Sequence, residues 1–272
     1  MHICTDMRLA DQSRVPDSTV VRTNRCTSER RPTMTMAACG SVTAETLGFE
    51  ASQAIPAAKG TLPKGLFAAK PTAPLSTKTK QHLVHSIASI TMLALLRPVN
   101  TGLEASARMP EILVLGLRLA DGVQETPDDV IELIASQRAS GILFAVVRTA
   151  EHEGTTREEC QFAVRRAIPV RAGHTPTFCV FHSAWEPAGE MFLDVNGATM
   201  DELWASLCSQ TILGSTDFAD LDARIARVER VRALEVAVAK LTADHKRAKN
   251  PAQRNEIYAK LHKAKNELAA LQ

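Results

Sequence analysis

Aromatic residues are scarce in this chain. Phe, Trp and Tyr make up 4% of its 272 residues, and Tyr258 is the single tyrosine. Proteins that bind single-stranded nucleic acid commonly stack bases on exposed aromatic rings, so the composition gives little support to that mode of binding. Lysine is missing from residues 81–239. Metal-dependent nucleases commonly place a lysine close to the acids of a strand, so this gap weakens a nuclease interpretation.

Motifs of the common catalytic classes are missing as well. The chain has no G-x-G-x-x-G, G-x-x-x-x-G-K-[ST], G-x-S-x-G or H-E-x-x-H, which argues against the standard dinucleotide, P-loop, hydrolase and zinc-protease sites. No run of eighteen apolar residues occurs, so we expect no membrane span. The six cysteines form no C-x-x-C pair, which predicts reduced thiols in a cytoplasmic protein. The sequence thus predicts no catalytic residue, no metal and no cofactor.

The first 45 residues show neither helical nor strand periodicity. They mix Thr, Ser, Arg and isolated Cys without building an apolar face, so we predict that residues 1–45 are disordered. The stretch MTMAACGSVTAETLGF, which begins at Met34, resembles a protein start more closely than the residues before it do. We therefore expect residues 1–35 to precede the native translation start.

Residues 46–216 have the pattern of one α/β domain. A helix is predicted from the capping residues Ser76 or Thr77 to Pro98, and a second helix starts at Thr126. A third helix follows Thr199. We predict a mixed sheet of about five strands packed by two or three helices. The predicted strands are aliphatic or alternating runs at 111–119, 141–149, 160–168, 175–182 and 189–197.

Residues 217–272 are predicted to form a helical hairpin. Apolar residues recur at coiled-coil spacing from Leu221 to Leu241, and the spacing loses phase at KNPA. Asn250 can cap a new helix there, with Pro251 at its first position. Two helices with so short a link favour an antiparallel αα-hairpin. A single long kinked helix is the alternative.

Charge is distributed unevenly, although the net charge is only +2. Residues 36–220 carry fourteen Lys and Arg against twenty Asp and Glu, whereas residues 221–272 carry twelve against six. The basic tail predicts contact with a protein partner or with nucleic-acid phosphates, and a helix pair that is basic for solubility is the alternative. We expect the basic residues to spread around the outer faces of the hairpin. The candidate contacts are Lys246, Arg247, Lys249, Arg254, Lys260, Lys263 and Lys265.

A divergent nuclease is a further hypothesis. Its candidate acids near predicted strand ends are Glu111, Asp121 and Asp194, and their convergence within metal-binding distance would support it. His82 and His85 lie one helical turn apart and could bind a metal together. No third ligand is near them in the sequence, so we expect two helical histidines without a metal.

The order of these elements resembles a bacterial domain-of-unknown-function family, number 4391. The matching stretches lie between about Gly48 and Gln272, and they are LPKGLF, STKTKQHLVHSIASITMLALLRP, PEILVLGLRLA, VIELIASQRASGILFAVV, MDELWASLC and the basic hairpin. The resemblance implies a bacterial cytoplasmic protein whose gene often neighbours methyltransferases and helicases of restriction or phage-defence type. It implies no catalytic residue.

These features favour a non-catalytic accessory protein of a bacterial DNA-modification or phage-defence system. We expect its hairpin to dock onto a protein partner, a helicase or methyltransferase of the same locus. Weak sequence-independent nucleic-acid binding and a divergent nuclease-like enzyme are the alternatives.

Overall fold

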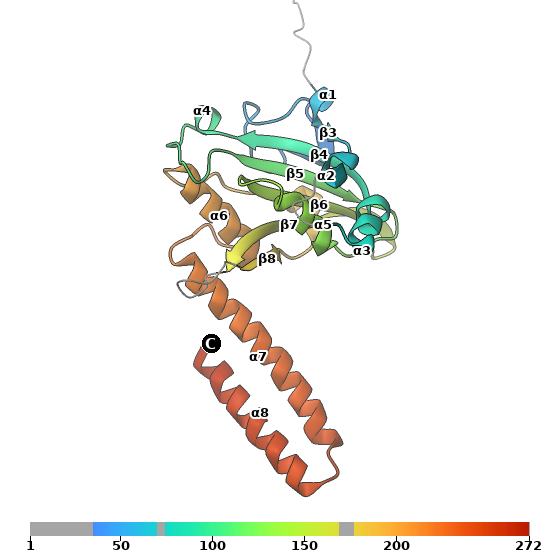
Figure 1. Ribbon diagram of the computed structural model, residues 1–272, viewed down its shortest axis with the longest axis vertical. Helices are drawn as coiled ribbons and strands as arrows, with labels where there is room; N and C mark the ends of the chain where they lie inside the picture. The colour runs from blue at the N-terminus through green and yellow to red at the C-terminus, as the bar shows by residue number, and fades with distance from the viewer. Residues whose placement is uncertain (1–34, 70–73, 169–176, 272) are drawn as a thin grey trace, which may run out of the picture. The chain divides into compact units, whose positions relative to one another are not determined.

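The computed structural model describes residues 35–69, 74–168 and 177–271. They belong to one compact unit that contains a mixed β-sheet, helices on both faces of the sheet and a C-terminal helix pair (Figure 1). The predicted α/β class is therefore confirmed. Most of the leader that was predicted to be disordered lies outside the described residues.

The central sheet has seven strands. Six follow the order β3-β4-β5-β6-β7-β8, and the short β9 pairs with β7 beside them. β5 and β6 are parallel, as expected for two strands joined through a helix, and the other neighbouring strands are antiparallel. The strands are β3 (Thr61–Leu62), β4 (Ile87–Leu96), β5 (Ile112–Leu119), β6 (Gly141–His152), β7 (Thr155–Ile168), β8 (Thr177–His182) and β9 (Glu186–Pro187).

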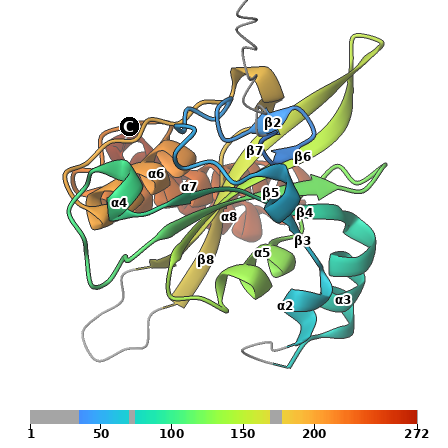
Figure 2. The same ribbon diagram turned by 90° about the horizontal axis from the view of Figure 1, so that it is seen from above.

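Two hydrophobic cores fill the two faces of the sheet. Leu143 and Ala145 of β6 belong to the core that α6 (Met200–Leu213) covers. Their neighbours Ile142 and Phe144 belong to the core that α5 (Asp128–Ala135) covers. Figure 2 shows α5 and α6 on opposite sides of the strands. Because both faces are buried, the central strands are almost continuously aliphatic.

The predicted helix from Ser76 to Pro98 is only half correct. Ser76 caps α3 (Thr77–Gln81), and its Oγ accepts a hydrogen bond from the Thr79 amide at 3.0 Å. One π-helical turn (His82–Ser86) follows, and the chain then becomes strand β4. The prediction is wrong beyond Ser86, because the β-branched residues that follow pair in a ladder with β5.

The prediction of disorder does not hold for residues 35–45. They form β1 (Ala38–Cys39) and β2 (Val42–Thr43), and Cys39 and Val42 are buried against the sheet. Gly116 of β5 lies directly beneath Cys39, and a Cβ atom at this position would overlap the Cys39 side chain. The glycine of a distant strand thus makes room for the segment.

The fifth predicted strand, 189–197, is not a strand. It begins with a 3-10 turn, η2 (Ala188–Glu190), and continues without a ladder. The Leu193 amide donates to the carbonyl of Leu47 at 3.0 Å instead. Thr126 also differs from its predicted capping role: its Oγ1 donates to Gln161 Oε1 at 2.8 Å, and Pro127 stands at the N-cap position of α5.

The C-terminal residues form the predicted helical hairpin. α7 (Leu221–Arg247) and α8 (Pro251–Leu271) run side by side in opposite directions (Figure 1). None of the described helices combines the length and the apolar character that crossing a bilayer requires. The remaining short helices are α1 (Ala57–Gly60), α2 (Gly65–Ala69) and α4 (Pro98–Thr101).

Candidate functional site

The three acids of the nuclease hypothesis lie at separate places. Glu111 precedes β5, and its Oε2 lies 2.7 Å from Arg97 Nη2. Asp121 follows the opposite end of the same strand, and Asp194 lies in the loop before α6. Within the described ranges, no group of three or more His, Cys, Asp or Glu side chains is arranged to hold a metal ion. The geometry gives the nuclease hypothesis no support.

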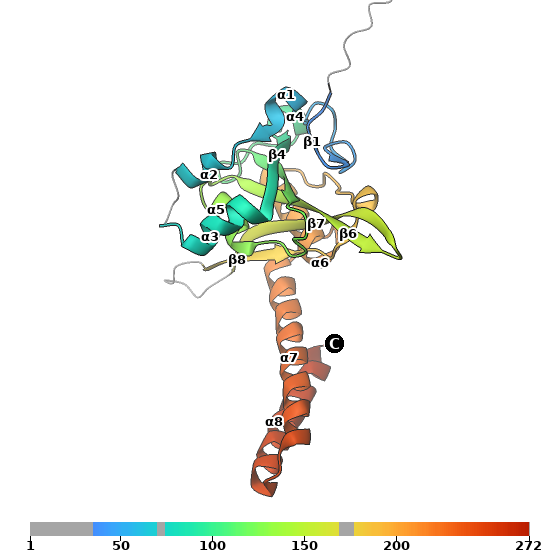
Figure 3. The same ribbon diagram turned by 90° about the vertical axis from the view of Figure 1, so that its right-hand side faces the viewer.

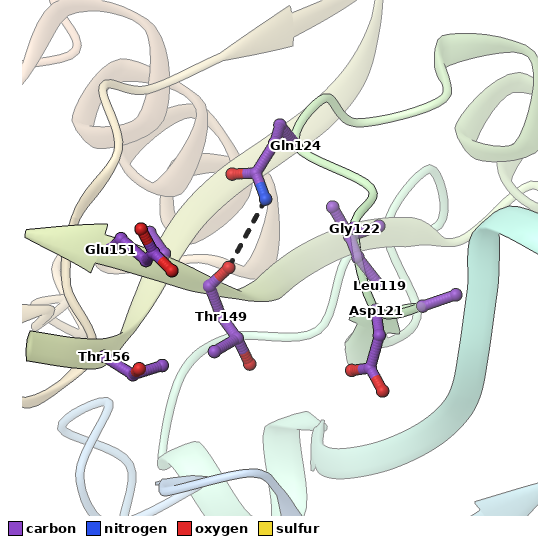
Figure 4. Close-up of a pocket in the computed structure, with 9 residues that line it drawn as sticks. Leu119, Asp121, Gly122, Gln124, Thr149, Glu151 and Thr156 are labelled. Atoms are coloured by element: carbon purple, nitrogen blue, oxygen red, sulfur yellow. Dashed lines mark hydrogen bonds between the residues drawn. The ribbon is translucent and has the colours of Figure 1, made fainter.

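A hollow of about 580 Å³ lies past the carboxyl end of β5 and beside residues 149–151, near the carboxyl end of β6 (Figure 4). Open α/β sheets commonly bind ligands at this position. The β6–β7 hairpin borders the hollow, because it continues to His152 and Thr155, past the last β5 pairing (Figure 3). Asp121 and Glu151 line the hollow, and its described lining contains no His, Lys, Arg or Cys. Carboxylates are thus its only charged groups.

The charged residues of the neighbouring strands are bound to one another. On one face, Arg118 forms an ion pair with Glu158 and donates from Nη2 to Thr149 Oγ1 at 2.9 Å. The Ser41 amide donates to Glu158 Oε2 at 2.7 Å. Burial alone would raise the pKa of Glu158, but the hydrogen bonds from Arg118 and Ser41 lower it overall. This cluster ties the β1–β2 segment to the sheet.

Glu159, the next residue, points to the opposite face and is 6% exposed. Its two oxygens accept hydrogen bonds from Arg148 Nη2 at 2.8 Å and from Arg157 Nη2 at 2.7 Å. These hydrogen bonds lower the pKa of the Glu159 carboxyl. The guanidinium of Arg148 also lies 4.0 Å from the ring centroid of Trp185. Every charged group of this cluster is engaged, which is typical of a structural role.

The histidines and cysteines of the body also have structural surroundings. His82 Nδ1 lies 2.8 Å from Asp129 Oδ1, and His182 Nε2 lies 2.7 Å from Asp128 Oδ1. Each pair joins the first turn of α5 to a neighbouring element. Burial raises the pKa of three thiols to about 12, so they stay protonated and poorly nucleophilic. These are the thiols of Cys39, Cys160 and Cys208.

The hairpin is joined to the body through the first two turns of α7. Leu221 and Ile225 belong to the same core as α6. Arg166 of β7 donates from Nη2 to Asp222 Oδ1 at 2.8 Å. Burial alone would lower the pKa of Arg166, but the hydrogen bond to Asp222 raises it overall, so its charge is secure. Beyond these turns, α7 packs mainly on α8.

The two helices cover their own seam. Leu234 of α7 and Leu261 and Ala264 of α8 are buried between them. Arg230 forms an ion pair with Glu267 across the helices. At the link, Asn250 Oδ1 accepts a hydrogen bond from the Ala252 amide at 2.9 Å and Pro251 starts α8, as predicted.

The seven candidate contacts lie around the tip of the hairpin and along α8. Two of them are engaged with acids: Arg247 Nη2 lies 2.6 Å from Asp244 Oδ1, and Lys260 Nζ lies 2.7 Å from Glu256 Oε1. Their role in partner binding stays a prediction. The other five candidates are exposed and have no acidic partner among the described residues; they are Lys246, Lys249, Arg254, Lys263 and Lys265.

Three rings accompany these cations, and the sequence analysis did not identify them. The Tyr258 ring neighbours two histidines, with its centroid 5.9 Å from that of His245 and 6.3 Å from that of His262. Tyr258 is 57% exposed. The link between α7 and α8 brings His245 to Tyr258, so only a correct pairing of the two helices could have predicted this contact.

Comparison with known proteins gives one match. The family model of a domain of unknown function, DUF4391, matches residues 52–268, which is most of the chain. No curated protein and no solved structure matches.

Proposed function

We propose that this chain, which belongs to the DUF4391 family, is a non-catalytic accessory protein that docks onto a larger enzyme through its α7–α8 hairpin. The enzyme we propose is a helicase or methyltransferase of a bacterial DNA-modification or phage-defence system. This partner class follows from the genomic context that the family resemblance implies. A cytoplasmic location, which the reduced thiols favour, is part of the same proposal.

One observation carries the proposal: α7 has a second apolar line on the side away from α8. This line starts with Leu221 and Ile225, which are buried in the core of the body. Helical spacing passes through Val228 and the exposed Arg232, and it then reaches Val236, Ala239 and Ala243, which we call the outer line. Val236 is 70% exposed, and no described element of the chain covers the outer line.

The outer line has the form of a docking surface. Its residues are spaced i, i+3 and i+7, which is the spacing of anchors that a helix places in a partner's groove. Alanine at two of the three positions allows a partner backbone to approach closely. Because α8 already covers the inner seam, the outer line can be occupied without opening the hairpin.

The body supports a scaffold role more than a catalytic one. Glu158 and Glu159 are both held by arginines, and the buried thiols are protonated. A carboxylate held in this way is a poor general base, because its proton affinity is lowered.

Affinity capture from the native host tests the proposal. The tagged full-length chain is expected to capture a helicase or methyltransferase. Val236→Glu is expected to lose this partner, because it places a charge on the outer line. Val99→Glu is a matched control, because Val99 is an even more exposed valine, at 90%, on α4 of the body. Equal capture by both variants, or a wild-type chain that always elutes alone, would overturn the proposal.

A further inference from the structure

The three rings and three of the unpaired cations lie on one side of the hairpin. Arg254, Tyr258 and Lys265 are spaced i, i+4 and i+11, which places them on one side of α8. Tyr258 contacts His262 on this side and His245 across the seam. The side spans about 16 Å along α8, from the rise of 1.5 Å per residue. We give the name ring face to the surface formed by His245, Lys246, Arg254, Tyr258, His262 and Lys265.

The opposite side of the hairpin carries two cations that are paired with acids. Its cations Arg247 and Lys260 are paired with Asp244 and Glu256. The ring-face cations Lys246, Arg254 and Lys265 have no acidic partner among the residues that the structure describes. The helical phase leaves Lys240 and Lys263 outside the ring face, and Lys249 lies in the link. The unpaired cations therefore lie on more than one side of the hairpin, and Lys246, Arg254 and Lys265 are the ones that lie beside the rings.

The ring of Tyr258 adds a second chemical feature to this charge. It is the only tyrosine of the chain, and it is exposed although a tyrosine usually buries much of its ring. Its neighbours are the tilted rings of His245 and His262, and its exposed surface is free to contact a base. An exposed ring between cations can stack on an unpaired base while the cations contact the adjacent phosphates.

We infer that the ring face binds single-stranded nucleic acid. Lys246, Arg254 and Lys265 contact phosphates, and Tyr258 stacks on one base. Duplex nucleic acid offers the phosphates but keeps its bases stacked inside, so Tyr258 favours the single strand. An acidic protein segment would use the cations and leave the ring without a role.

This binding is independent of the proposed docking surface. The outer line lies on α7 and faces away from α8, whereas Arg254, Tyr258 and Lys265 of the ring face lie on α8. Lys246 follows Ala239 by seven residues and so borders both surfaces. A protein partner on the outer line leaves the α8 residues of the ring face open. Failure of one proposal therefore does not decide the other, and Val236→Glu is expected to bind nucleic acid like wild type.

Fluorescence anisotropy of labelled dT20 with the full-length chain tests the inference. Three phosphate contacts predict a slope of about −2 for log affinity against log salt, since each contact to a single strand contributes about −0.7. Affinity is then expected to fall about 20-fold between 50 and 200 mM salt. A flat salt dependence would overturn the inference.

Two variants matched in composition locate the site. Arg254→Gln with Lys265→Gln leaves one phosphate contact, so the salt slope is expected to fall to about −0.7. Arg247→Gln with Lys260→Gln removes the same two charges from the paired side and is expected to keep the wild-type slope. Equal losses in both variants would show a response to net charge alone and overturn the inference. Circular dichroism verifies the helices, and Arg254→Gln alone is used where the double variant does not fold.

The ring is tested by Tyr258→Leu against Tyr258→Phe. The leucine variant is expected to lose about tenfold in dT20 affinity, and the phenylalanine variant is expected to retain it. A 20-base-pair duplex is expected to bind more weakly than dT20 at equal salt. Binding of poly-glutamate as tightly as dT20, or an unchanged affinity of the leucine variant, would assign the ring face to acidic partners in general and overturn the inference.

Discussion

Arg166 of β7 and Asp222 of α7 join the sheet to the hairpin through an ion pair of 2.8 Å between Nη2 and Oδ1. The arginine side chain is 19% exposed and the aspartate side chain is 51% exposed. The pair stands beside Leu221, whose side chain is buried in the core of the body. The first turn of α7 is thus fixed by an apolar contact and an ion pair together.

A double-mutant cycle measures this pair. We expect Arg166→Ala to destabilise the protein more than Asp222→Ala does, because the arginine is the more buried partner. The coupling between the two changes is expected to be about 0.5–1 kcal/mol, as for a partly exposed pair. Urea unfolding of the two single variants and the double variant provides the values. If the two single losses in the free energy of unfolding add up to that of the double variant, the result would contradict an energetic contribution from the ion pair.

Gly40 is expected to tolerate substitution poorly. Its φ is +62°, and a Cβ atom there would lie 2.5 Å from Arg118 Nη1 and 2.6 Å from Glu158 Oε1. Gly40→Ala places a side chain on a left-handed backbone and also disturbs the ion pair. It is therefore expected to lower the free energy of unfolding by about 3 kcal/mol in total. Gly122 also has a positive φ, +81°, but has no heavy atom within 4 Å of such a Cβ. Gly122→Ala is expected to lower the free energy of unfolding, measured with urea, by only about 1 kcal/mol.

The lowered pKa of Glu159 predicts a specific dependence of stability on pH. Its pKa is lowered from the ordinary value of 4.5 in the folded protein by Arg148 and Arg157. The unfolded chain therefore takes up a proton at a higher pH than the folded one. The stability that Glu159 contributes is present above pH 4.5 and is lost as the pH falls through the folded pKa.

Glu159→Gln is expected to lower the free energy of unfolding at neutral pH and to flatten its decline in acid. Arg157→Gln removes one of the two donors, so its pH profile is expected to lie between those of Glu159→Gln and wild type. Urea unfolding at several pH values measures both profiles. An acid decline in Glu159→Gln as steep as in wild type would assign the effect to other carboxylates.

Asn250 is expected to stabilise the start of α8. Its Oδ1 accepts the Ala252 amide, so Asn250→Ala loses this cap and about 1 kcal/mol of local stability. Asn250→Asp keeps an acceptor oxygen and is therefore expected to retain the cap and the local stability. Hydrogen exchange of the α8 amides measures the change. Unaltered exchange in Asn250→Ala would show that packing on α7 alone sets this end of the helix.

The sequence predicted best those elements whose pattern is local. The break between α7 and α8 was visible because Asn250 and Pro251 are helix-start residues and the apolar spacing changes there. β5 and β6 were visible because both faces of each strand are buried, which leaves a continuous aliphatic run.

β4 was mistaken for a helix for a physical reason. Its register with β5 shifts between Ile87 and Ser89 and again between Met92 and Ala94. Each shift breaks the two-residue alternation of a strand, and the buried residues then recur at a spacing close to that of a helix. The β-branched residues of this segment were the better indicator of a strand.

The misjudged segments at both ends of the body depend on distant residues. The 35–45 segment is ordered because Gly116 admits Cys39. The 189–197 segment stays outside the sheet because β6, β8 and β9 already occupy the edges of β7. The ring face likewise depends on the pairing of His245 with Tyr258 across the link. Local pattern contains none of this information.

The most direct test of the docking proposal is photocross-linking from the outer line in the native host. A photoreactive phenylalanine analogue replaces Val236 in one chain and Val99 in the control. We predict that the Val236 chain cross-links to one helicase or methyltransferase and that the Val99 chain does not. A Val236 chain that cross-links to no such protein, although it is folded and expressed at the level of the control, would contradict the account.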